Sequence, residues 1–287
     1  MALSFLVLLA AATVSPVSFA HADAAEGDVI ITLGEDLSEQ QREEILNEME
    51  APDKPEIVTV TNEEEHQYLG NYISKAQIGS RALSSSKITV GKQGSGLIIE
   101  TRNINWVTKE MYANALTTAG VKDADIYITA PFEVSGTAAL TGIIKAYEIS
   151  ADVTITEQQK QVANEEMVTT AELGDKVGAD KAAELMTNIK EKIAENKPET
   201  DAEMRTLIEN AAKELGITLS DAELDSLVDL FNKMKELDID WNQVSAQLEK
   251  AKENFKNFME SEEGQSILEK LKRFFSNVID ALSALFR

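Results

Sequence analysis

The most constraining feature of this sequence is that strand-type segments stop near residue 150, whereas helical periodicity continues afterwards. Runs rich in β-branched residues alternate with helical segments up to Ser150, and none follows Thr156. Strands that alternate with helices indicate a sheet covered by helices, whereas helical periodicity alone indicates packed helices. The sequence therefore predicts an α+β chain, with an α/β-like domain over 28–150 and an all-helical domain over 156–287. We expect these two halves to fold separately.

The first half is expected to contain a mixed sheet of about five strands. Polar and small residues over Gly79 to Ser86 predict a loop, and the glycine-rich stretch from Gly91 to Gly96 predicts the turn of a β-hairpin. Such a hairpin would make the sheet mixed in direction. The expected strands are 29–33, 57–60, 87–90, 97–101 and 125–130, and the expected helices are 38–49, 61–73, 108–119 and 135–149.

The second half is expected to contain six helices, of which the last has the clearest amphipathic pattern. Apolar residues between Gln265 and Phe286, among them Phe274 and Phe275, share an arc of about 140° on a helical projection. Three covers for this arc remain open: the other helices, a second copy, or peripheral contact with a membrane surface. Breaks between the helices are expected at Gly174, Gly178, Pro198, Gly216, 238–240 and Gly264.

Residues 1–22 have the pattern of a signal peptide. An apolar run from Leu3 to Leu9 is followed by Ala20-His21-Ala22, a small-x-small cleavage pattern, although no Lys or Arg precedes the run. We therefore expect a mature chain that begins at Asp23 and is secreted or associated with the cell envelope. No transmembrane span is expected beyond this segment. The chain has no cysteine, so packing rather than disulfides must stabilise the exported form.

The charge balance argues against nucleic acid as a partner. The chain has 50 Asp and Glu residues against 27 Lys and Arg residues, a formal net charge of −23. Such a field repels nucleic acid and anionic lipid, and a solvated acidic surface is its simplest interpretation. The expected partner is an envelope polymer or a protein.

The residues needed for most kinds of catalysis are missing. His66 is the one histidine left after the signal peptide is removed, and no cysteine is present. Cys-His catalysis and thiolate zinc sites are therefore impossible, and His66 follows Glu63-Glu64-Glu65 on an expected solvated helical face. We expect no enzyme activity and no cofactor. The alternative is a hydrolase that uses two carboxylates on a wall polymer or peptide, which would need two such groups facing each other in a cleft.

Two polar segments are candidates for binding an anion. Arg81 precedes Ser84, Ser85 and Ser86, and a guanidinium beside hydroxyl groups can hold an anion by hydrogen bonds. The segment 135–137 (Ser-Gly-Thr) begins an expected helix, whose free backbone N–H groups could do the same. An ordinary turn and ordinary helix capping explain these residues better.

A weak calcium candidate lies between two expected helices. Asp238, Asp240, Asn242 and Glu249 occupy positions 1, 3, 5 and 12 of an EF-hand loop. Gln243 stands where the sharp turn of that loop requires glycine. A simple N-cap by Asp240 accounts for the same residues, so we expect no metal.

One long stretch resembles a known family. The segment from Asn103 to Glu148, together with 61–70 (TNEEEHQYLG), 78–88 (IGSRALSSSKI) and ANEEMVTT from Ala163, resembles the domain of unknown function 1002 family. These are YpuA-like secreted proteins of Gram-positive bacteria. The resemblance implies an exported, envelope-associated or extracellular protein, and it carries over no catalytic residues. The expected function is therefore non-enzymatic and based on binding.

Overall fold

The computed structural model describes residues 26–151, 153–237 and 239–260. Five strands form one sheet in the order β2-β1-β3-β5-β4. The sheet is mixed as expected, because β1 is parallel to β2 and β4 is parallel to β5, whereas β3 is antiparallel to both of its neighbours. The strands are β1 (Val29–Gly34), β2 (Glu56–Val60), β3 (Ser85–Val90), β4 (Leu97–Thr101) and β5 (Ala124–Thr129).

The predicted hairpin between β3 and β4 is wrong. These strands are consecutive in the chain, but β5 lies between them, with Ile88 of β3 opposite Ile126 of β5. The glycine-rich link instead wraps around the beginning of β5, where the backbone N–H of Gly91 donates to the carbonyl of Asp123 at 2.7 Å. A Cβ on Gly91 would lie 2.8 Å from that carbonyl oxygen. The glycine therefore permits a close crossing rather than a tight turn.

Most helices follow the expected segments closely, because most begin at a side-chain cap. The segment expected as one helix over 61–73 instead ends at Leu69, and an unexpected short helix, Lys75–Ile78, follows it. Ser38, Thr61 and Ser220 each form a capping box with a Glu or Gln three residues later. The helices are α1 (Glu39–Glu48), α2 (Asn62–Leu69), α3 (Lys75–Ile78), α4 (Lys109–Thr118), α5 (Thr137–Ala151), α6 (Glu157–Val177), α7 (Ala179–Asn196), α8 (Asp201–Glu214), α9 (Asp221–Glu236) and α10 (Trp241–Glu260).

One expected helix break does not occur. Gly174 lies inside α6, which continues to Val177. A Cβ at Gly174 would lie 3.2 Å from the terminal methyl group of Met111 and 3.1 Å from the Cα atom of Ala179. The glycine thus lets α4 and the start of α7 approach α6 closely, and Gly178 ends the helix instead.

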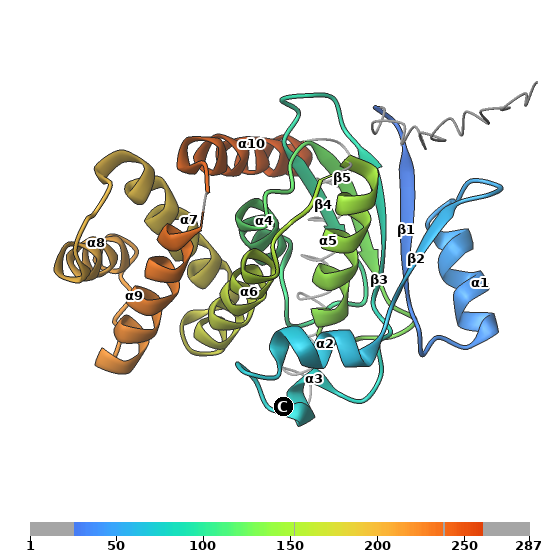
Figure 1. Cartoon of the computed structure of the whole chain (residues 1–287), viewed down its shortest axis with the longest axis horizontal. Helices are drawn as coiled ribbons and strands as arrows, with labels where there is room; N and C mark the ends of the chain where they lie inside the picture. Colours follow the sequence, from blue (N-terminus) through green and yellow to red (C-terminus); the bar gives the residue numbers. More distant parts are fainter. Residues whose placement is uncertain (1–25, 152, 238, 261–287) are drawn as a thin grey trace, which may run out of the picture.

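The elements form layers on both sides of the sheet (Figure 1). Helix α1 covers one face, where Ile45 and Met49 join Ile31 and Leu33 of β1 in a small core. Helices α4, α5 and α6 lie on the opposite face, and α7, α8 and α9 lie farther out on that side. None of the described helices combines the length and apolarity needed to cross a bilayer.

The main core does not stop at the expected domain boundary. Strand residues such as Ile88 and Ile126 share one buried cluster with Ala163, Met167 and Val168 of α6. A second cluster lies among α6, α7, α8 and α9. The change from mixed to all-helical structure occurs between α5 and α6, but α6 contributes to the cores on both sides. This shared packing argues against separate folding of the two halves.

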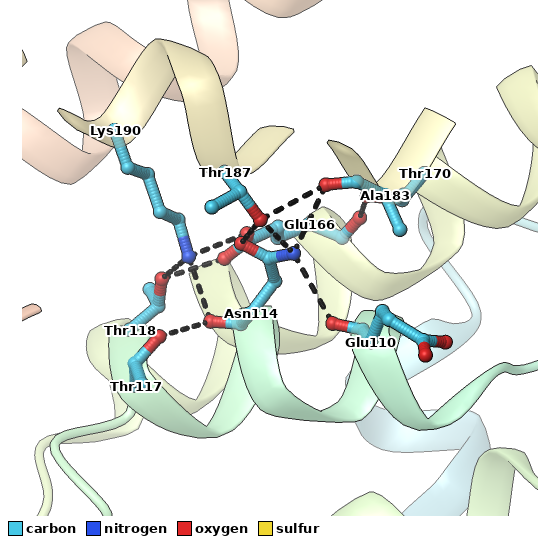
Figure 2. Close-up of polar contacts among 9 residues, drawn as sticks. All are labelled: Glu110, Asn114, Thr117, Thr118, Glu166, Thr170, Ala183, Thr187 and Lys190. Carbon is cyan, nitrogen blue, oxygen red and sulfur yellow. Dashed lines mark hydrogen bonds and ion pairs between the residues drawn. The ribbon is translucent and has the colours of Figure 1, made fainter. Parts of the chain in front are cut away.

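A buried polar network fixes α4, α6 and α7 against one another (Figure 2). Lys190 and Glu166 form an ion pair of 2.6 Å, with side-chain exposures of 1% and 0%. The ammonium group also donates to the carbonyl of Asn114 and to the hydroxyl of Thr118, which in turn donates to Glu166. Burial lowers the pKa of Lys190, and the charge of Glu166 opposes this shift. The network is enclosed by helices, so we interpret it as structural.

Candidate functional site

The clearest candidate site is a cavity of about 300 Å³ at the beginning of α5, which we call the Arg81 cavity. It brings together the two segments in which the sequence analysis placed possible anion sites. Glu65 and Arg81 are the two residues of its lining with ionisable side chains. The lining residues are Glu65, Gln77, Ile78, Gly79, Ser80, Arg81, Leu83, Ser84, Phe132, Val134, Ser135, Gly136, Thr137 and Ala138.

The segment that carries Arg81 is held in place by the turn after β1. The backbone N–H of Ala82 donates to the carboxylate of Asp36 at 2.8 Å, and the backbone N–H of Asp36 donates to the carbonyl of Ala82 at 3.2 Å. The backbone N–H of Gly34 donates to the hydroxyl of Ser85 at 3.3 Å. These bonds place Arg81 and Ser84 directly before β3, on the wall of the cavity.

Arg81 and Ser84 offer hydrogen-bond donors to this cavity. The guanidinium carbon of Arg81 lies 5.8 Å from the ring centroid of Phe132, whose side chain is 44% exposed. Ser84 is only 2% exposed, and no hydrogen bond to its hydroxyl occurs within the described residues. An uncommitted hydroxyl beside a guanidinium group is suited to an anionic oxygen.

The first turn of α5 is positioned by a buried tyrosine. The hydroxyl of Tyr112 donates to the carbonyl of Gly136 at 2.5 Å. Gly136 has a φ of 95°, and a methyl group there would collide with the Tyr112 hydroxyl and with Ile104. The first turn of α5 itself contains no acidic residue, but the carboxyl group of Glu65 on α2 lies there, 3.0 Å from the hydroxyl of Thr137, the first residue of the helix.

Glu65 is the unusual residue of the site, because it is a carboxyl group buried without a cation. Its side chain accepts hydrogen bonds from Thr137 at 3.0 Å and Asn62 at 3.1 Å, and the residue is 1% exposed. It forms no ion pair within the described residues. Burial, aided by the charge of Asp36, raises the pKa of Glu65 to about 7.

Sequence reasoning missed Glu65, since the run Glu63-Glu64-Glu65 was interpreted as a solvated helical face. The structure buries one of the three, because Glu65 lies four residues before the fully buried Leu69 on the same face of α2. The sequence signal that could have identified Glu65 is its position on the same helical face as the apolar Leu69. His66 is on the same helix, with a ring nitrogen 3.2 Å from the carbonyl oxygen of Gly79.

Two of the predicted site residues do not belong to the cavity. Ser85 and Ser86 were expected in a loop, but they begin β3 and are fully buried. The hydroxyl of Ser86 lies 2.7 Å from that of Thr32 on β1, and Ser85 donates to the carbonyl of Leu83 at 3.3 Å. Their side chains therefore join neighbouring strands, and Arg81 and Ser84 remain at the site.

The calcium candidate does not form a loop in the described part of the chain. Asp240 accepts hydrogen bonds from the backbone N–H groups of Asn242 and Gln243, both at 3.1 Å, as an N-cap does. Glu249 lies about two turns farther along α10 and is exposed, and Asp238 lies outside the described residues. No group of three or more acidic or histidine side chains among the described residues is placed to hold a metal ion.

Further predicted features lie outside the described residues. These are the signal peptide, with its cleavage site before Asp23, and the terminal amphipathic segment with Phe274, Phe275 and Phe286. The described part of the chain does contain a second cavity, of about 130 Å³, between β4, α4, α7 and α10. Its walls are mostly apolar. One part is lined by Asn114 of the buried network and by Thr187, whose hydroxyl accepts a hydrogen bond from the Asn114 amide at 3.0 Å.

Comparison with known proteins places the chain in a family. A family model described as "Protein of unknown function (DUF1002)" matches residues 33–251. The chain belongs to the DUF1002 family. It is 58% identical over 267 residues to "Uncharacterized protein YpuA" of Bacillus subtilis (strain 168), covering 93% of this chain and 92% of that relative. No solved structure matches the chain. The DUF1002 match spans both halves and includes all residues that line the Arg81 cavity.

Proposed function

We propose that this chain is an exported, non-enzymatic protein of the cell envelope or its surroundings, and that it acts by binding an anionic group in the Arg81 cavity. The observation that carries this proposal is the convergence of Arg81 and the uncommitted hydroxyl of Ser84 on one cavity, beside the beginning of α5. Each of these features is common in loops and helices, but their meeting in one hollow is not required by capping or turn formation. An envelope polymer or an envelope protein is the expected source of the anion.

Substitution of Arg81 tests this binding. Mature protein that begins at Asp23 is incubated with isolated Gram-positive envelopes, and the bound fraction is measured by sedimentation. Arg81→Gln should weaken binding roughly tenfold, since a charge-assisted hydrogen bond contributes about 1.5–3 kcal/mol. Arg102→Gln is the matched control, because Arg102 pairs with Glu48 at 2.8 Å and does not line the cavity. Equal binding by both variants and the wild type would contradict the proposal.

Export is tested separately. The pattern around Ala20-His21-Ala22 predicts that the protein recovered outside the cytoplasm begins at Asp23 or within a few residues of it. N-terminal sequencing of the form recovered from envelopes and medium checks this. Full-length protein with an intact Met1, retained in the cytosol, would contradict the predicted export.

Glu65 favours a second candidate function, a secreted hydrolase. A buried carboxyl group with a pKa of about 7 has the protonation behaviour of a general acid. Hydrolysis by carboxylates needs a second such group, and Asp36 does not line the cavity although its charge contributes to the shift. Release of reducing ends or amino groups from envelopes, lost in Glu65→Gln, would support the hydrolase over the binding protein.

A further inference from the structure

The Arg81 cavity contains one acidic and one basic side chain that are not paired with each other. Glu65 and Arg81 both line it, and no ion pair joins them. Arg81 instead lies over the ring of Phe132, and Glu65 accepts bonds from the neutral groups of Thr137 and Asn62. Two opposite charges that share a hollow without meeting leave room for a ligand between them.

Each charge has a reason to prefer a ligand of opposite sign. An ionised carboxylate that is 1% exposed loses most of its hydration, and two neutral donors only partly replace it. A ligand cation would restore the missing charge compensation at Glu65. Arg81 and the Ser84 hydroxyl, which also line the cavity, favour an anion.

Ligands with a single charge fit this wall less well. An anion alone would meet the favourable donors but would lie in the same small cavity as the Glu65 carboxylate, which repels it when ionised. A cation alone would be attracted by Glu65 and repelled by Arg81. A molecule that carries both charges satisfies both groups at once, and a cavity of about 300 Å³ suits a small one.

We propose that the ligand of the Arg81 cavity is a small zwitterion, with a protonated amine at Glu65 and a carboxylate or phosphate at Arg81 and Ser84. This inference rests on the proposed function, because it names the ligand class of the same site. The shared chemistry is an ammonium group a few bonds from an anion. It is found in free amino acids and in amino-bearing phosphates of envelope components.

Three probes of similar size separate the contributions of the two charges. Alanine carries both charges, propionate lacks the amine, and ethylamine lacks the carboxylate. Binding to the mature chain is measured by isothermal titration calorimetry at about pH 8, where Glu65 is mostly ionised. We expect alanine to bind roughly tenfold more tightly than propionate, and ethylamine to bind more weakly than alanine by a similar factor. O-phosphoethanolamine replaces alanine in a parallel series, and the tighter of the two identifies the anion as carboxylate or phosphate.

Two variants assign the charges to residues. Glu65→Gln should weaken alanine binding roughly tenfold and leave propionate binding unchanged or stronger. Arg81→Gln should weaken the binding of both. Glu63→Gln is the matched control, because Glu63 lies on the same helix, is exposed and does not line the cavity. Circular dichroism spectra that match the wild type confirm that each variant is folded.

The outcomes distinguish failure of the zwitterion proposal from failure of the anion site on which it rests. If propionate binds as tightly as alanine and Glu65→Gln does not weaken either, the zwitterion is excluded while the anion site stands. If Arg81→Gln leaves the binding of every probe unchanged, or if none of the amine-bearing or anionic probes binds, the anion site and the zwitterion are both excluded. Loss of alanine binding in Glu65→Gln, with propionate binding retained, is the result that supports the inference.

Discussion

Neighbouring carboxylates on one helix of this protein have opposite pKa shifts, and the cause is the presence or absence of a cation. Burial opposes ionisation of Glu64, but its hydrogen bond and ion pair with Lys145, 2.6 Å away, outweigh burial and lower the pKa of Glu64. Glu65 has no such partner in the described structure, and burial raises its pKa to about 7. The sequence alone could not distinguish the two, because Lys145 approaches from a helix 81 residues away.

The raised pKa of Glu65 predicts a pH-dependent stability. Between its ordinary value of 4.5 and about 7, the folded chain keeps a proton that the unfolded chain releases. The free energy of unfolding should therefore fall as pH rises through this window, by at most about 3 kcal/mol, and the contribution of Glu65 should be constant above it. Urea melts of wild type and Glu65→Gln across the window check this. The variant should lack this decrease, whereas parallel curves for the two proteins would refute the assignment.

The buried ion pair between Lys190 and Glu166 predicts a large loss of stability when one partner is removed. Lys190→Met leaves Glu166 buried without its cation, and we expect the free energy of unfolding to fall by about 3–5 kcal/mol. Replacing both residues with methionine should restore most of this loss, because no uncompensated charge remains. Lys192→Met is the control, since Lys192 pairs with Glu214 near the surface and should contribute less than about 1 kcal/mol. Equal effects of Lys190→Met and Lys192→Met in urea melts would contradict this interpretation.

At the scale of elements, the sequence predicts local structure well and strand pairing poorly. The ends of α1, α2 and α9 are encoded by capping boxes, which act over four residues and can be read directly. Strand β4 lies beside β5 in the sheet, although α4 lies between the two strands in the chain. Local sequence signals therefore do not reveal this pairing. The glycine-rich link has the local sequence pattern of a hairpin turn. Its actual role, crossing the beginning of β5, is visible only from the contact with Asp123 in the folded structure.

The close packing around Gly136, where the Arg81 cavity meets α5, predicts how an added methyl group there changes the stability of the fold. Gly136→Ala combines an unfavourable positive φ with a collision against Tyr112 and Ile104. Gly178→Ala has a similar φ, 98° against 95°, but nothing lies within 4 Å of the added atom. We expect Gly178→Ala to cost about 1–2 kcal/mol from backbone strain and Gly136→Ala to cost about 1–3 kcal/mol more from overpacking. Thermal melts measure both, and equal losses would show that the collision is relieved.

At the scale of the whole molecule, the sequence indicates where the secondary structure changes but not where the core ends. The last strand and the first long helix of the second half are recognisable from periodicity. Whether that helix packs on the sheet is decided by residues such as Met167 and Val168, whose apolar character fits either core. The same limit applies to the site, because Arg81, Glu65 and α5 converge only through the tertiary fold.

The shared core predicts that the first half alone is not a stable domain. A fragment of residues 26–151 lacks α6 and α7 and exposes the apolar face of α4, including the fully buried Met111. We expect this fragment to unfold without a cooperative transition and to bind a hydrophobic dye, whereas residues 26–260 should melt cooperatively. Circular dichroism melts of both fragments decide. A sharp transition for 26–151 would support separate folding of the two halves.

The position of β5 has a consequence for the order in which the sheet is completed. If the chain is exported from its N-terminus as proposed, β3 and β4 emerge before β5, although β5 separates them in the sheet. Until residue 129 has emerged, the edges of β3 and β4 that later bind β5 have no partner of their own, and unpaired strand edges are prone to wrong pairing. The sheet is completed when β5 inserts between β3 and β4, rather than by adding a strand at its edge. Such insertion relies on contacts between distant parts of the sequence and is intrinsically slow.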